Sequence, residues 1–187
     1  MSAMEMQAPE TWLDKPDDCE VVVGYDDQPS RDAALRLCQH LEKNFQGDLD
    51  FAFTWWKFKY LVEPALARQA SEAAARADLI IISTHYDHEL SPDIQDWIEE
   101  WVPMRKNQEG ALTALTREAH HPELWVSPLG LYLSAVAQRA QLDFISPHSL
   151  IQDDAWQTIR SREHQVTPLL NEILRRTHPV SHWGLNE

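Results

Sequence analysis

The chain has few cysteines and no long hydrophobic segment. Its only two cysteines, Cys19 and Cys38, have neither the number nor the spacing of a zinc site or a redox pair. We expect both to be buried, where cysteine behaves as a small apolar residue. No apolar run approaches the roughly 20 residues of a membrane-spanning helix. Residues 1–18 also lack the basic start and apolar centre of a signal peptide. These absences predict a cytoplasmic protein with reduced thiols.

Basic residues are also scarce. The chain carries 16 Lys and Arg against 30 Asp and Glu, which gives a formal net charge of -14. Because such a chain repels phosphate backbones and anionic lipid surfaces, its composition argues against nucleic acid and membranes as partners. We expect a protein partner instead, or self-association as a homodimer.

The apolar residues alternate between strand-like and helix-like spacing. Strands are expected at residues 20–25, 49–58, 79–83, 111–116 and 142–145. A helical pattern fills each interval, and the Ser-Pro pairs at 91–92 and 127–128 mark two helix starts, each with a capping hydroxyl. With right-handed crossovers, this pattern predicts an α/β three-layer sandwich with a five-stranded parallel sheet. The commonest order for five such strands is 2-1-3-4-5.

Three regions are expected along the chain. Residues 1–18 form an N-terminal arm, residues 19–149 form the α/β domain, and residues 150–187 form a C-terminal helical extension with a docked tail. Trp97 and Trp101 lie one helical turn apart, which is typical of core residues. In the order 2-1-3-4-5, the aromatic strand at 49–58 is an edge strand that needs cover. The C-terminal extension or a second subunit could supply this cover.

Polar and titratable residues follow the first and third strands directly. In an open α/β sheet, ligands bind outside the carboxyl ends of the strands, at the point where the strand order reverses. For this order, that point lies between strands 1 and 3. The residues expected to form this candidate ligand-binding rim are Asp26, Asp27, Ser83, Thr84, His85, Asp87, His88, Thr116 and Ser146.

Two kinds of chemistry at this rim follow from residue types alone. Carboxylates and imidazoles together suit zinc, manganese or iron, provided that the loop after the third strand curls to bring them together. The candidate metal ligands are Asp26, Asp27, His85, Asp87 and His88. Ser83 with a nearby histidine and Asp87 also has the residue types of a catalytic triad, but no Gly-x-Ser-x-Gly elbow surrounds the serine.

The order of elements resembles the receiver domain of response regulators. Asp26 and Asp27 match the acidic pair that binds magnesium in that family, and Thr116 fits the hydroxyl residue that ends the fourth strand. Ser83 stands where the phospho-accepting aspartate belongs, and Ser146-Pro147 replaces the expected Lys-Pro. A hydroxyl is a poor substitute for a carboxylate in acyl-phosphate formation. The resemblance therefore implies a receiver relative that has lost phosphotransfer.

Residues 77–84 and 91–98 resemble the third strand and the following helix of flavodoxin-like proteins and flavin-dependent reductases. In order of elements, this likeness covers roughly residues 20–146. Those proteins hold the flavin phosphate in a turn rich in Ser, Thr and Gly after the first strand. Here that turn reads Asp-Asp-Gln-Pro at residues 26–29, so two carboxylates would repel the phosphate.

The sequence therefore predicts a non-catalytic regulatory or binding module of receiver-like fold. The alternative is a flavodoxin-like oxidoreductase that depends on a flavin or a divalent metal and uses the rim. We expect no bound cofactor in the first case.

Overall fold

A computed structural model describes residues 17–46, 49–105, 109–118, 126–145 and 147. The helices α1–α4, strands β1–β5 and short 3-10 helices η1 and η2 occur in the order β1 (Asp17–Tyr25), α1 (Gln28–Asn44), β2 (Leu49–Lys57), η1 (Phe58–Tyr60), α2 (Pro64–Arg76), β3 (Leu79–Tyr86), α3 (Pro92–Trp101), η2 (Val102–Met104), β4 (Ala111–Glu118), α4 (Pro128–Ala140) and β5 (Asp143–Ile145).

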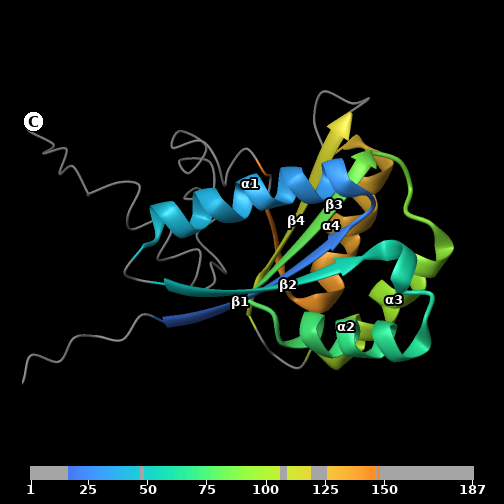
Figure 1. Ribbon diagram of the computed structural model, residues 1–187. Helices are drawn as coiled ribbons and strands as arrows, with labels where there is room; N and C mark the ends of the chain where they lie inside the picture. The colour runs from blue at the N-terminus through green and yellow to red at the C-terminus, as the bar shows by residue number, and fades with distance from the viewer. Residues whose placement is uncertain (1–16, 47–48, 106–108, 119–125, 146, 148–187) are drawn as a thin grey trace, which may run out of the picture.

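The five strands form one parallel sheet in the order β2-β1-β3-β4-β5 (Figure 1). This confirms the predicted fold class and strand order. Helix α1 packs on one face of the sheet, and α2, α3 and α4 pack on the other, so the described residues form three layers. The strand order reverses between β1 and β3, which pair from Val21↔Leu79 to Tyr25↔Ser83.

The two faces of the sheet bury separate apolar clusters. On the α1 face, Val21, Val23 and Ile81 pack with Leu37 and Leu41 of the helix. Cys19 and Cys38 lie in this cluster, each 2% exposed, as predicted. Burial raises the pKa of both thiols to about 12.

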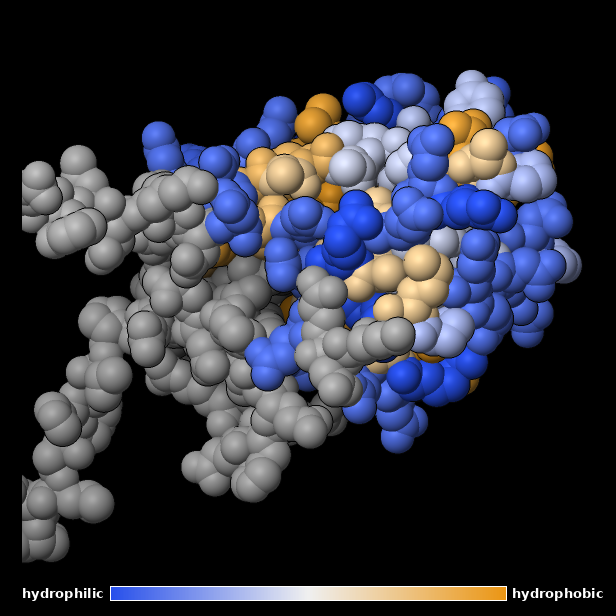
Figure 2. Space-filling model, turned by 90° about the horizontal axis from the view of Figure 1, so that it is seen from below, coloured by the Kyte–Doolittle hydropathy of each residue, from blue (hydrophilic) through white to orange (hydrophobic). Residues whose placement is uncertain are grey.

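The opposite face holds the larger cluster, which contains Trp97 and Trp101. Both indoles are buried, as predicted, and their rings pack edge to face with centroids 6.3 Å apart. Seen from the side of α2, the surface is mostly hydrophilic, with small separate hydrophobic patches (Figure 2).

Several elements differ from the expected boundaries. Strand β1 begins at Asp17, inside the predicted arm, and β3 continues to Tyr86 instead of ending at Ser83. The apolar run ends at Ile82, but backbone pairing continues through polar residues, with Thr84 opposite Thr116 and Tyr86 opposite Glu118. Sheet hydrogen bonds depend on the backbone, so side-chain polarity did not mark the end of the strand.

Ser127 caps α4, because its hydroxyl accepts the N–H of Gly130 at 3.0 Å. Ser91 occupies the same position before α3, but its hydroxyl makes no capping bond. The cap prediction is therefore correct for one serine and wrong for the other.

Two predicted regions lie outside the described residues: the arm before Asp17 and the extension at 150–187. Within the described part of the chain, no helix is both long enough and apolar enough to cross a membrane.

Candidate functional site

The ends of β1 and β3 meet at the carboxyl edge of the sheet. The N–H of Asp26 donates to the carbonyl oxygen of Ser83 at 3.2 Å, which extends the pairing of the two strands by one residue. The N–H of His85 then donates to Oδ2 of Asp26 at 3.0 Å. The structure therefore brings the two predicted halves of the rim together.

Asp27 is the N-cap of α1. Its carboxylate accepts the N–H of Ser30 at 2.8 Å, and Pro29 occupies the first turn of the helix. Burial alone would raise the pKa of Asp27, but the bonds from Ser30 and the His85 ring outweigh it, so the pKa lies below its usual value. A flavin phosphate bound as in flavodoxin-like proteins would need this same helix end, which the carboxylate of Asp27 already occupies.

Replacing Asp27 with alanine is expected to destabilise the protein by about 1 kcal/mol at neutral pH, because the cap is lost. The lowered pKa means that the folded state favours the ionised carboxylate. This stabilisation is present above the unfolded-state pKa of Asp27 and is lost as the pH falls through the folded-state value. The free energies of unfolding of the variant and the wild type should therefore become equal at acidic pH. Urea unfolding between neutral and acidic pH measures the difference, and Asp27→Ser, which keeps a capping oxygen, is the control.

The His85 ring lies between the carboxylate of Asp27 and the guanidinium of Arg117. Its Nδ1 is 3.3 Å from Oδ2 of Asp27 and 3.3 Å from a guanidinium nitrogen of Arg117. One ring nitrogen can donate to the carboxylate or accept from the guanidinium, but it cannot do both at once. Arg117 was not expected at the site, because it lies on β4 beyond Thr116, in a strand that was expected to end earlier.

Asp26 is exposed at the rim, next to Asp27. Desolvation raises its pKa, the N–H of His85 opposes this, and the negative charge of Asp27 adds to it, so the net pKa lies above its usual value. Of the two neighbouring carboxylates, Asp26 therefore binds a proton more readily.

Two hydroxyl residues of the rim, Ser83 and Thr84, donate to backbone carbonyl oxygens. The hydroxyl of Ser83 is fully buried and donates to the carbonyl oxygen of Ser30 at 2.8 Å, which ties β3 to the first turn of α1. The hydroxyl of Thr84 donates to the carbonyl oxygen of Tyr86 at 2.7 Å. Thr116 is half-buried and lies opposite Thr84 in the sheet.

The expected metal ligands do not form one metal-binding cluster, because the chain continues as a strand to Tyr86 and bends only at Asp87 and His88. The His85 ring contacts Asp27 and also packs against the Tyr86 ring, with centroids 4.2 Å apart. Tyr86 in turn stacks on His88, with ring centroids 5.2 Å apart. Asp87 is only 1% exposed. Among the described residues, no three His, Cys, Asp or Glu side chains are placed to hold a metal ion. Ser146 lies outside the described residues.

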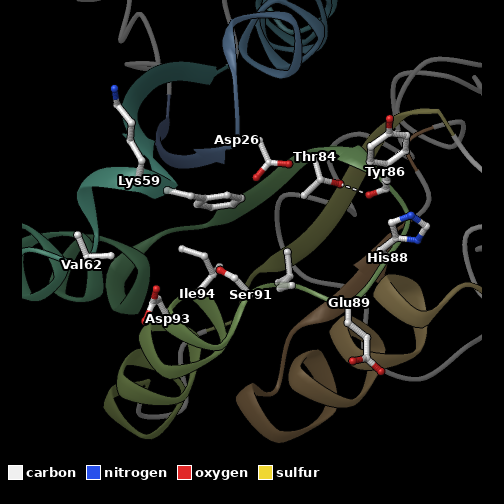
Figure 3. A pocket seen from close by; sticks show the side chains of 12 residues that line it. Asp26, Lys59, Val62, Thr84, Tyr86, His88, Glu89, Ser91, Asp93 and Ile94 are labelled. Carbon is white, nitrogen blue, oxygen red and sulfur yellow. Dashed lines mark hydrogen bonds between the residues drawn. The ribbon is translucent and has the colours of Figure 1, made fainter.

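A cavity of about 280 Å³ opens on the α3 side of the rim (Figure 3). Asp26 points into it from the end of β1, and Ser91, Asp93 and Ile94 line it from the start of α3. The ammonium group of Lys59 lies 4.8 Å from the ring centroid of Tyr60 and points away from the cavity. The other residues that line the cavity are Phe58, Val62, Thr84, Tyr86, His88, Glu89 and Leu90.

Phe58 forms part of this wall because Gly24 leaves room for it. A Cβ atom at position 24 would lie 2.5 Å from Cε1 of Phe58, closer than any real side chain approaches. Phe58 was expected at the end of a strand, where this contact would not form. The contact depends on a chain reversal at η1, which the aromatic pattern did not mark.

No protein-family model matches the chain, and no curated protein sequence matches it.

Proposed function

We propose that the chain is a non-catalytic binding module with a receiver-like sheet that does not transfer phosphoryl groups. The observation that supports this most directly is the state of Ser83. The residue at the acceptor position is a fully buried hydroxyl that donates to the backbone of α1. Acyl-phosphate formation needs an accessible carboxylate at that position.

The acidic pair supports the same proposal. In a phosphorylatable receiver, these carboxylates hold magnesium. Here Asp27 accepts the N–H of Ser30 and contacts His85, and Asp26 accepts the N–H of His85. Each carboxylate thus has a bonding role in the strand ends and the first helical turn.

The cavity beside Asp26 is the proposed binding site for a small ligand. It lies at the carboxyl ends of the strands next to the β1–β3 switch point, where ligands bind in open α/β sheets. Its walls combine apolar and aromatic side chains, such as Phe58 and Ile94, with a larger number of polar ones, among them the carboxylates of Asp26 and Asp93.

Incubation with acetyl phosphate and Mg²⁺ tests the loss of phosphotransfer. Intact-mass spectrometry of the full chain is expected to show no added phosphoryl group, with a phosphorylatable receiver domain as the positive control. A stoichiometric phosphoryl adduct on Asp26 or Asp27 would refute the proposal.

A thermal-shift screen against a panel of small metabolites tests the cavity. Ser91 lines the cavity, is exposed and makes no capping bond, so Ser91→Trp should fill the space at little cost to the fold. A ligand of the cavity should raise the melting temperature of the wild type and of Ser91→Ala, but not that of Ser91→Trp. Equal shifts in all three proteins would place the ligand elsewhere.

A further inference from the structure

Strand β2 is the outermost strand at one end of the described sheet. It spans nine residues and pairs along its whole length with β1 on one side. Long edge strands are usually protected by proline, several charges, a bulge or a short length. The sequence of β2, Leu-Asp-Phe-Ala-Phe-Thr-Trp-Trp-Lys, contains no proline and only two charged residues. Its outer edge is therefore a template for pairing with another strand.

The α1 face of this strand carries a row of aromatic side chains. Phe51 and Phe53 stack with ring centroids 5.7 Å apart, and Trp55 lies 6.5 Å beyond Phe53. All three are only partly buried. On the opposite face, Ala52 and Thr54 are exposed. An added strand would thus extend an apolar row on one face and meet the small side chains of Ala52 and Thr54 at the centre of the other.

The strand is complementary to a second copy of itself. An antiparallel arrangement that pairs all nine residues has its two-fold axis at Phe53. Phe51 then lies opposite Trp55 of the second copy, on the same face, and Ala52 lies opposite Thr54 of the second copy. Aromatic pairs directly opposite each other are among the pairs that stabilise sheets.

Charge also favours a second copy at this edge. The chain as a whole carries a net charge of -14, so most approaches between two copies are repulsive. Strand β2 carries one negative charge, Asp50, and one positive charge, Lys57, and has no net charge. In the pairing centred on Phe53, Asp50 lies opposite Trp56 of the second copy and Lys57 lies opposite Leu49, so no like charges meet.

We propose that two copies of the chain associate through antiparallel pairing of their β2 strands, which makes one continuous sheet across the dimer. This surface is the outer edge of β2, whereas the cavity lies at the carboxyl ends of β1 and β3. Failure of one proposal therefore leaves the other standing.

Paired charge variants of the full chain test the register directly. Ala52→Lys combined with Thr54→Lys places lysine opposite lysine twice across the axis, which should raise the dimer dissociation constant at least about tenfold. Ala52→Lys combined with Thr54→Glu changes the same two exposed positions but places lysine opposite glutamate twice. This matched control should remain dimeric. Light scattering coupled to size-exclusion chromatography, repeated over a range of protein concentrations, measures all three proteins.

Three results would overturn the proposal. One is a wild type that is monomeric at every concentration. Another is a Lys/Lys variant that dimerises as strongly as the Lys/Glu control, which would place the interface elsewhere. The third is a monomer whose β2 amides are all protected from hydrogen exchange, which would assign the edge to a segment of the same chain, such as residues 148–187.

Discussion

Replacing Arg105 with alanine is expected to destabilise the fold by about 3–5 kcal/mol, because several buried carbonyl groups lose their donor together. Arg105 follows η2 and is 8% exposed. One guanidinium nitrogen donates to the carbonyl oxygens of Ala74 at 2.8 Å and Ala77 at 2.9 Å, at the end of α2. A second guanidinium nitrogen donates to the carbonyl oxygen of Glu109 at 3.3 Å. The last carbonyls of a helix have no partner within it, so here a side chain from another element supplies one.

Burial lowers the pKa of Arg105, and the negative charge of Asp78 opposes this. Removing the guanidinium therefore also removes a positive charge that interacts favourably with Asp78. Arg105→Lys should fall between the wild type and the alanine variant, because a single ammonium group cannot reach carbonyls on both sides.

Urea unfolding of the full chain measures the effect of Arg105→Ala. Arg76→Ala is the matched control, since Arg76 is also in this region but is exposed, and its ion pair with Glu20, at 3.9 Å, lies on the surface. A surface pair of this kind contributes at most about 1 kcal/mol. If both alanine variants lost the same small amount of stability, the proposed role of Arg105 would be wrong.

Replacing Trp97 with alanine is expected to cost about 3–5 kcal/mol, as is usual for a large buried aromatic residue. Trp97 is 2% exposed and packs against Trp101 and against Phe58, whose ring centroid lies 6.4 Å away. Phe58 lines the cavity, so a void at position 97 should also loosen that wall. Trp97→Ala should therefore weaken any ligand that the cavity binds.

Trp97→Phe should cost much less, about 1.5 kcal/mol or below, because it keeps an aromatic ring in the core. Among the described residues, the indole N–H of Trp97 has no hydrogen-bond partner, so the phenylalanine variant removes a buried donor that makes no bond. Thermal and urea unfolding of the two variants measure the contrast. If both variants lost the same free energy of unfolding, the indole N–H would be stabilising and would have a partner.

The strand order could be predicted because few local rules determine it. Five short apolar runs separated by helical segments leave parallel pairing with right-handed crossovers as the natural solution. The residues at which each strand begins and ends could not be predicted equally well. Strand β3 continues through Thr84, His85 and Tyr86, because this segment pairs with the backbone of β4. Nothing in the side chains of one strand shows how far its neighbour extends.

The location of the site could be predicted, but not its internal arrangement. The meeting of Asp26 and Asp27 with His85 follows from the strand order. The row of ring contacts from His85 through Tyr86 to His88 could not be predicted, because it depends on the continuation of β3 to Tyr86. Arg117 and Phe58 were missed because each depends on where a neighbouring element ends.

The position of β1 in the sheet has a consequence for synthesis on the ribosome. One edge of β1 pairs with β2, which follows soon after it in the sequence. The other edge pairs with β3, from Val21↔Leu79 onward, and so has no partner until β3 has been synthesised. Until β3 emerges, the apolar run at residues 21–23 has an open edge on a nascent chain. Asp18 and Glu20 directly precede that run, where charged residues act as gatekeepers against aggregation. The acidic start of β1 thus protects the chain most during the interval before its sheet is complete.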